Sequence, residues 1–223
     1  EENNLNINMW INSDGKTILK KLNKIDKIKL SKDAEEIFYK TLFTNSYSPR
    51  INLTASVFLN FKSEWLIKNE KTKIIENYLL KNPSLTKKGI LIEYLVDKSL
   101  LESNIDDACE KLKFVTKDYE SEYLDKFFIY CLINNDKVEE AQLRFDLLKE
   151  REFKNDFYEK KIIYLLGYIK EPDYSISDKN LFEFHLSHII NPDFKYEPNE
   201  KTNKKIWKYL SNSNLLNSSS NID

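Results

Sequence analysis

The sequence predicts an all-α protein, built as an α-solenoid-like array of antiparallel helical hairpins. Three observations predict this class. Apolar residues recur at three- and four-residue spacing from Asp14 to about Leu210, the breaks between segments are short, and the 223 residues include only three glycines. The spacing gathers apolar side chains on one face of a helix, which needs a partner helix to cover it. Antiparallel sheets use glycine in hairpin turns, and the one Asp-Gly pair, Asp14-Gly15, opens a polar segment.

The expected helices, about ten or eleven, follow in order along the chain. Helix starts carry capping residues, as at Ser31, and short links make neighbouring helices antiparallel. With bounds good to about two to four residues, the periodicity predicts helices near 15–24, 31–44, 53–65, 71–81, 87–101, 105–112, 123–131, 138–148, 157–169, 178–189 and 202–211.

The helices form one predicted helical-repeat domain over residues 13–211. The first eight residues are mostly polar, and residues 1–12 are expected to be a flexible N-terminal segment. Residues 212–223 are almost all Ser, Asn and Asp, and are expected to be a disordered tail.

Two helix starts match each other at an offset of 33 residues. Ile105-Asp106-Asp107-Ala108 and Val138-Glu139-Glu140-Ala141 have the same aliphatic-acidic-acidic-Ala order. Ser103 and Asp136 each precede an acidic residue by three positions, the spacing of a capping box. A repeated helical hairpin is therefore expected.

This repeated helix start resembles the second helix of tetratricopeptide-type repeats, whose period is near 34 residues. The resemblance covers at most residues 65–150, and the family's Trp, Gly, Tyr and Pro positions are not filled in phase. It implies the shape of that superfamily. The order of elements, with a Trp10 segment, a Ser48-Pro49-Arg50 turn and then hairpins, is similar to uncharacterised exported helical proteins of alphaproteobacteria, for which no activity is known.

The overall charge disfavours nucleic acid as a partner. The chain has 35 basic and 36 acidic side chains, a formal net charge of −1, whereas binding to a phosphate backbone needs clustered, uncompensated Lys and Arg. One basic stretch stands out and either touches an anionic surface or acidic partner or, as we favour here, is the solvated face of amphipathic helices. It contains Lys16, Lys20, Lys21, Lys24, Lys27, Lys29 and Lys32.

The sequence identifies no catalytic residue and no cofactor site. Three glycines do not supply a phosphate-binding loop, and no nucleophile motif is present. His185 and His188 are candidates for a metal site because their spacing places both rings on one helix face. Two ligands fall short of a recognised zinc site, so packing with a hydrogen bond explains them equally well, and no metal is expected.

Three aromatic residues in the candidate loops 170–177 and 191–203 are candidates for partner binding. Tyr174, Phe194 and Tyr196 each lie close to a proline, where a rigid turn presents a ring to a partner. The alternative, which we favour, is that these rings fold back over the last hairpins.

The sequence favours one cellular compartment without determining it. Cys109 and Cys131 lie at apolar helix positions, and the sequence does not decide whether they form a disulfide. No apolar run is long enough to cross a bilayer. Because the chain begins with Glu1 instead of Met, a cleaved leader or a trimmed start is expected, and a bacterial periplasm or envelope is favoured over the cytoplasm.

These observations predict a non-catalytic scaffold or adaptor that binds a protein or peptide partner on its helical surface. Two alternatives stay open. One is an accessory helical domain of a cell-wall-acting or other multidomain enzyme, and the other is an RNA-binding helical repeat protein.

Overall fold

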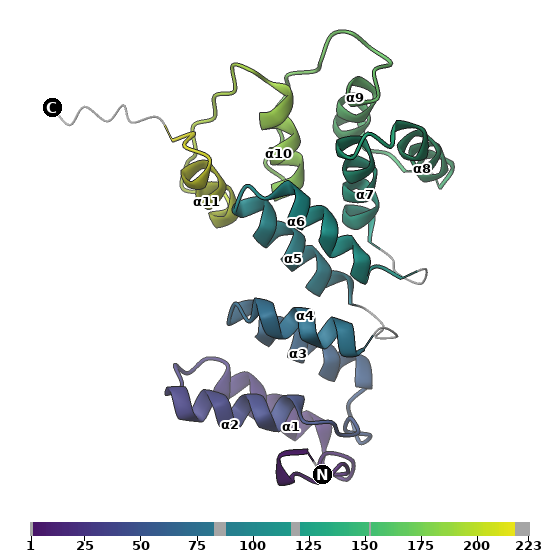
Figure 1. The fold of residues 1–223 in the computed structure, drawn as a ribbon. Helices are drawn as coiled ribbons and strands as arrows, with labels where there is room; N and C mark the ends of the chain where they lie inside the picture. Colours follow the sequence, from purple (N-terminus) through teal and green to yellow (C-terminus); the bar gives the residue numbers. More distant parts are fainter. Residues whose placement is uncertain (1, 83–87, 117–120, 152, 217–223) are drawn as a thin grey trace, which may run out of the picture. The chain divides into compact units, whose positions relative to one another are not determined.

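The computed structural model describes residues 2–82, 88–116, 121–151 and 153–216. Within these ranges the chain is helical, and the one β-type pairing is an isolated bridge between Asp14 and Ile51, so the all-α class is confirmed. No helix in these ranges combines the length and apolarity that a bilayer span requires. The elements are η1 (Glu2–Asn4), α1 (Gly15–Ile25), α2 (Lys32–Phe43), α3 (Ala55–Lys68), α4 (Thr72–Lys81), α5 (Gly89–Leu101), α6 (Ile105–Glu110), η2 (Lys111–Phe114), α7 (Glu122–Asn134), α8 (Val138–Glu150), α9 (Asp156–Leu165), α10 (Leu181–Ile190) and α11 (Lys204–Asn212) (Figure 1).

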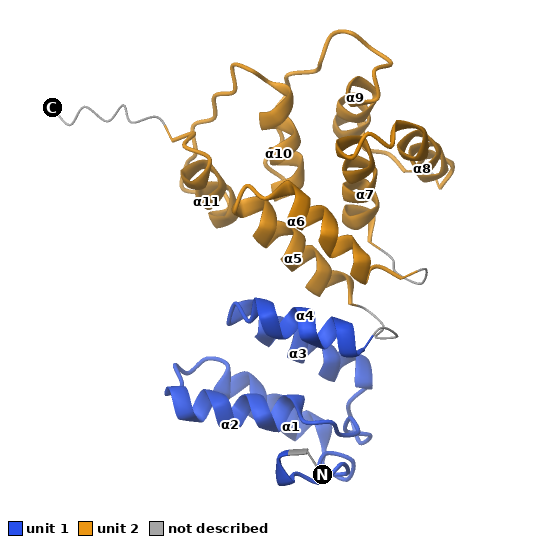
Figure 2. Cartoon of the chain, viewed as in Figure 1, with its two compact units in different colours: residues 1–87 blue, residues 88–223 orange. Residues whose placement is uncertain are grey.

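The chain divides into two compact units (Figure 2). Unit 1 spans residues 1–87 and contains α1 to α4, and unit 2 spans residues 88–223 and contains α5 to α11. The sequence predicts one helical domain over 13–211, and periodicity alone carries no signal for this division, because each helix shows the same kind of apolar stripe on either side of it.

Helix α5 is the centre of unit 2, and it contacts α6, α7, α10 and α11. Of these helices, α11 is the farthest from α5 in the sequence. Lys205 Nζ donates to Asp97 Oδ2 at 2.5 Å, and Asn212 Nδ2 donates to the Leu101 carbonyl at 2.6 Å. Hairpins that contact only their sequence neighbours would lack these bonds. The C-terminal helices therefore close back onto the first helix of their unit.

Three helical hairpins turn in the same way, 33 residues apart. Glu70, Ser103 and Asp136 follow α3, α5 and α7, and their φ angles of 49°, 56° and 58° lie in the left-handed region. After Glu70, the Lys71 N–H donates to the Leu66 carbonyl at 3.0 Å, and the equivalent bonds after Ser103 and Asp136 are 3.0 and 2.9 Å. This is the Schellman closure of a helix C-terminus. The hairpins α3–α4, α5–α6 and α7–α8 thus share one turn geometry.

This turn corrects the capping expected from the sequence. Ser103 and Asp136 are not N-caps, because each is the left-handed residue that closes the preceding helix. Asn104 caps α6 instead, with its Oδ1 accepting from the Asp107 N–H at 3.0 Å, and Lys137 precedes α8 without a side-chain cap. An N-cap residue has non-helical backbone angles, typically in the β region, whereas Ser103 and Asp136 are in the left-handed region. The N-cap positions are therefore the next residues, Asn104 and Lys137.

Cys109 of α6 and Cys131 of α7 form a disulfide, which settles the question that the sequence leaves open. Their Cα atoms are 5.6 Å apart, and the bond closes a loop with a sequence separation of 22 residues. Such a loop stabilises the folded state chiefly by restricting the unfolded chain.

The segment before α1 is held against unit 1, in contrast to the flexibility expected for residues 1–12. The Tyr47 N–H donates to the Ile7 carbonyl at 2.9 Å, and the Trp10 ring packs edge-on against Phe58 with centroids 5.7 Å apart. Gly15 is packed so closely that a Cβ there would overlap Leu53. At the other end α11 reaches residue 212, and residues 217–223 of the expected tail lie outside the described residues.

The left-handed turns predict a stability change. Asp136→Gly is expected to raise the free energy of unfolding by up to about 1 kcal/mol, because glycine takes this conformation without a Cβ penalty. Gln142→Gly, at an exposed position inside α8, is the matched control and is expected to lower it by about 0.5–1 kcal/mol. Urea denaturation measures both, and a loss of stability in Asp136→Gly would contradict the role given to this turn.

Candidate functional site

Unit 1 carries an apolar groove, which we call the α1–α2 groove. Its volume is about 610 Å³, and only Ser13, Lys21 and Thr41 contribute polar side chains to its wall. Surfaces of this size and polarity are suited to the apolar side chains of another molecule. The apolar lining residues are Trp10, Ile18, Leu22, Ile25, Leu30, Ala34, Ile37 and Phe38.

The groove exists because α2 has more apolar surface than its neighbours cover. Phe38 and Leu42 are buried in the core of unit 1, but Ile37, one residue along, is 66% exposed. Adjacent positions on a helix point about 100° apart, so Ile37 cannot share the buried face. From α1, the buried residues Ile18 and Leu22 and the half-buried Ile25 form the opposite wall of the groove.

Trp10 lines this groove with its ring and keeps a buried hydrogen-bond donor without a partner in the described ranges. Its ring is half-buried, and its Nε1 is the one buried side-chain nitrogen or oxygen without a partner among the described residues. An unpaired buried N–H costs about 1–3 kcal/mol, so this position lowers the stability of unit 1.

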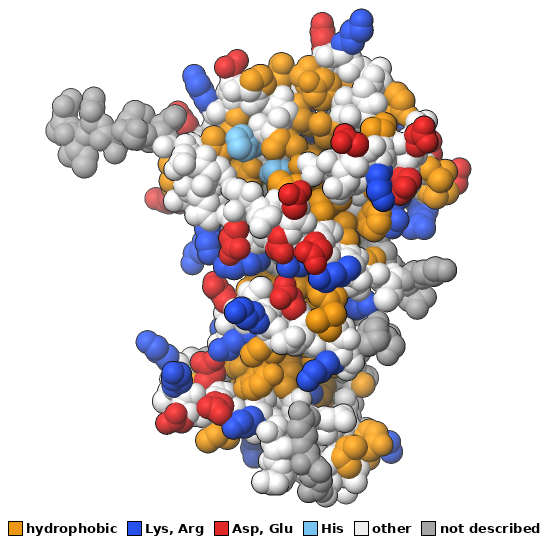
Figure 3. Space-filling model, in the orientation of Figure 1, with side chains coloured by type: hydrophobic (Ala, Val, Ile, Leu, Met, Phe, Trp, Pro, Cys, Tyr) orange, Lys and Arg blue, Asp and Glu red, His pale blue; other side chains and the backbone are white. Residues whose placement is uncertain are grey.

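The side of the groove formed by α1 is basic. Lys21 lines it, and none of the seven lysines between residues 16 and 32 forms an ion pair with a described residue. Two of the nearby carboxylates have cationic partners elsewhere: Asp26 pairs with Lys68 at 2.6 Å and Glu36 with Lys40 at 2.7 Å. On the face of unit 1 drawn in Figure 3, lysine side chains border apolar ones.

The two units differ in charge although the whole chain is nearly neutral. Residues 1–87 contain 15 basic and 10 acidic side chains, a formal net charge of +5. Residues 88–223 contain 20 basic and 26 acidic side chains, a formal net charge of −6. The charge balance of the chain therefore conceals a basic N-terminal unit.

Unit 1 also buries a lysine between aromatic rings. Lys62 of α3 is 9% exposed, and its Nζ lies 4.7 Å from the Phe58 ring centroid and 5.7 Å from that of Phe43. Burial lowers the pKa of Lys62 to about 8. The aromatic faces stabilise the cation only in part, because they replace its hydration shell incompletely.

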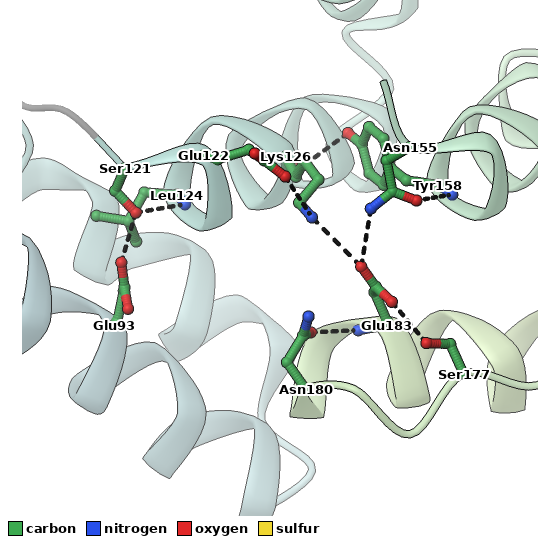
Figure 4. Close-up of polar contacts among 10 residues, drawn as sticks. All are labelled: Glu93, Ser121, Glu122, Leu124, Lys126, Asn155, Tyr158, Ser177, Asn180 and Glu183. Atoms are coloured by element: carbon green, nitrogen blue, oxygen red, sulfur yellow. Dashed lines mark hydrogen bonds and ion pairs between the residues drawn. The ribbon is translucent and has the colours of Figure 1, made fainter. Parts of the chain in front are cut away.

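Unit 2 contains a buried polar cluster that joins α7, α9 and α10 (Figure 4). Lys126 Nζ lies 3.3 Å from Glu183 Oε1, and both side chains are almost fully buried. Asn155 Nδ2 donates to Glu183 Oε1 at 3.0 Å, and Ser177 Oγ donates to Oε2 at 2.6 Å. Burial raises the pKa of Glu183, but the hydrogen bonds from Ser177 and Asn155 and the charge of Lys126 outweigh it and lower the pKa overall.

This cluster fixes helices in place more readily than it performs chemistry. Tyr158 Oη donates to the Lys126 carbonyl at 2.9 Å, and the side chains of Asn155 and Asn180 cap α9 and α10. Both carboxylate oxygens of Glu183 are already bonded within the protein. A general acid or base needs a free face toward its substrate, which this arrangement does not offer.

The two candidate metal ligands belong to a second buried network. His185 and His188 each place Nδ1 2.9 Å from Tyr209 Oη, and His185 Nε2 lies 3.0 Å from Tyr130 Oη. Burial, together with the nearby His188, lowers the pKa of His185 to about 3, so its ring is neutral at neutral pH. Both ring nitrogens of His185 are used inside the protein. No group of three or more His, Cys, Asp or Glu placed to hold a metal ion occurs in the described ranges.

The structure separates the three aromatic candidates. Phe194 packs on Phe184 with centroids 5.5 Å apart, and Tyr196 packs on the same ring at 4.9 Å. Tyr196 Oη also donates to Asp178 Oδ2 at 2.7 Å. Tyr174 is 53% exposed. Two of the three rings therefore fold back onto α10, and only Tyr174 faces solvent.

Comparison with protein-family models, with curated proteins and with solved structures finds no match to this chain.

The buried lysine of unit 1 predicts a pH-dependent stability change. The pKa of Lys62 is about 8 when folded and 10.5 in its ordinary range, so the cost of burying the charge is complete below pH 8 and disappears as the pH rises through 10.5. Lys62→Met is expected to raise the free energy of unfolding at pH 7 by on the order of 3 kcal/mol, and by less than half of that at pH 9.5. Urea denaturation at both values measures this, and an equal gain at the two pH values would contradict it.

The buried Lys126–Glu183 pair of unit 2 predicts that substitutions of the two residues have strongly coupled effects on the free energy of unfolding. Lys126→Met leaves the Glu183 charge uncompensated and is expected to lower the free energy of unfolding by about 3–5 kcal/mol. Adding Glu183→Gln removes that charge while keeping an oxygen for Asn155, so it should restore at least about 1 kcal/mol. Denaturation of the two single variants and the double variant measures the coupling, and purely additive losses would refute the pairing.

Proposed function

We propose that the protein is a non-catalytic helical scaffold or adaptor that binds a protein or peptide partner, and that the α1–α2 groove is its contact surface. The observation that carries this proposal is the apolar lining of the groove, in which Ile37 is 66% exposed and Ile25 and Leu30 are half-buried. Exposing such a surface is unfavourable unless another molecule covers it, since each buried Å² of apolar area is worth roughly 25 cal/mol.

The polar groups elsewhere support binding over catalysis. The ionisable side chains of the Lys126–Glu183 cluster are bonded to one another inside unit 2. The histidine pair is likewise committed to tyrosine hydroxyls. These arrangements are typical of structural networks, which hold helices at fixed positions.

The hairpins support a solenoid-like architecture of the tetratricopeptide kind. The turn at Glu70 recurs at Ser103 and at Asp136, and helices that repeat with a fixed period stack into arrays with extended binding surfaces. In this proposal unit 1 contributes the hairpin α3–α4, unit 2 contributes α5–α6 and α7–α8, and α10 and α11 close the C-terminal end of unit 2.

The disulfide supports a location outside the cytoplasm. Bonds such as Cys109–Cys131 persist in oxidising compartments and are rare in reducing ones. In this proposal the protein works in a bacterial periplasm or envelope.

RNA binding is the second candidate function, and the net charge of +5 in unit 1 is the observation that favours it. RNA contacts depend on charge and on stacking, so they predict an affinity that falls steeply with salt and does not depend on Ile37. Peptide binding in the groove instead predicts an affinity that falls when Ile37 is replaced by a charged residue.

Selection from a random peptide display library tests the proposal. Peptides enriched on the wild-type protein are expected to bind Ile37→Glu at least about tenfold more weakly, because a carboxylate would be buried in an apolar groove. Leu80→Glu is the matched control, because Leu80 lies in α4 of the same unit at 61% exposure and outside the groove. Peptides that bind Ile37→Glu and the wild type equally would refute the groove as the contact surface.

A further inference from the structure

The shape and polarity of the α1–α2 groove restrict the conformation of its occupant. An extended peptide carries unpaired backbone N–H and C=O groups, and the groove wall offers only Ser13, Lys21 and Thr41 to bond them. An α-helix satisfies its own backbone and presents an apolar stripe at three- and four-residue spacing. The apolar stripe of a helix therefore suits the lining of this groove better than an extended peptide does.

The charge beside the groove restricts the other face of the occupant. Lys21 lines the groove, and Lys24 is its neighbour three residues along α1, at the border between the groove and the flank that carries Lys20 and Lys27. Lys29 precedes Leu30, which also lines the groove, so positive charge continues past the end of the helix. None of these lysines forms an ion pair with a described residue.

Acidic groups of unit 1 do not cancel this charge. Asp26 is paired with Lys68 and Glu35 with Lys71, so two of the carboxylates close in sequence to these lysines are held by cations from elsewhere in the unit, whereas Asp33 forms no ion pair with a described residue. Residues 1–87 keep a formal net charge of +5, so a partner that supplies carboxylates gains affinity and a faster association.

From these observations we propose that the occupant is an acidic amphipathic α-helix of a protein partner. Its apolar stripe packs on Ile25 and Ile37, and its carboxylates lie along the α1 side of the groove, toward Lys21 and Lys24. This inference rests on the proposed function and adds the chemistry of the partner. The binding mode is a helix in a groove, with charge deciding orientation and selectivity.

The test uses three synthetic helical peptides that share one apolar stripe and carry acidic, uncharged or basic residues on their flanks. Isothermal titration calorimetry with the full chain is expected to give at least about tenfold tighter binding for the acidic peptide than for the uncharged one, with an affinity that falls as salt rises. The basic peptide is expected to bind most weakly.

Two double variants test whether the preference for the acidic peptide comes from the lysines beside the groove. Lys21→Glu with Lys24→Glu is expected to weaken the acidic peptide at least about tenfold and to bring its affinity to or below that of the uncharged peptide. Lys73→Glu with Lys81→Glu, on exposed positions of α4, is the matched control and is expected to leave the affinities within about twofold. Circular dichroism of each variant verifies that the helices are retained.

The outcomes separate the two proposals. Equal binding of the acidic and uncharged peptides, still sensitive to Ile37→Glu, would overturn the acidic partner while the groove remains the contact surface. Peptide binding that is insensitive to Ile37→Glu would overturn the proposed function as well. Binding of a single-stranded RNA or of anionic phospholipid vesicles that outcompetes the acidic peptide, and that requires Lys21 and Lys24, would overturn the acidic helix as occupant.

Discussion

The need to cover an apolar helix face governs the whole structure. The α-helices of the described ranges run from 6 to 14 residues, which is marginal or too short for a helix alone in water. Each one is stable because its apolar stripe is packed against a neighbour. In unit 2 this requirement is met around α5, which is contacted from four other helices. In unit 1 it is met only in part, since α1 and α2 bury one side against their neighbours and leave the α1–α2 groove open.

The two units also treat charge differently. Unit 2 places Lys126 and Glu183 in its interior and satisfies both with hydrogen bonds from several helices. Satisfied polar networks of this kind specify one arrangement of helices, because any other arrangement leaves a buried charge alone. Unit 1 instead carries a run of unpaired lysines on α1 next to apolar surface. Charged side chains thus hold helices together inside unit 2, whereas unit 1 displays them at its surface beside apolar residues.

Periodicity was sufficient to predict the helices, because an apolar stripe such as Val138 to Leu148 has the same consequence in any helical fold. The capping residues were not predictable, since Ser103 looks like a cap until the left-handed turn that it closes is known. The disulfide depends on the packing of α6 against α7, which no spacing shows. The groove was hidden for a related reason: the sequence shows that Ile37 and Ile25 are apolar, but only packing shows which apolar faces remain uncovered.

The central claim is that the uncovered face of α1 and α2 is the surface that a partner covers. Isoleucine methyl NMR of the full chain, titrated with the acidic amphipathic peptide, measures this directly. The account predicts that the methyl resonances of Ile25 and Ile37 shift on binding, while those of Ile92 and Ile162, which are fully buried in unit 2, keep their positions. Shifts concentrated in unit 2, with Ile25 and Ile37 unchanged, would contradict it.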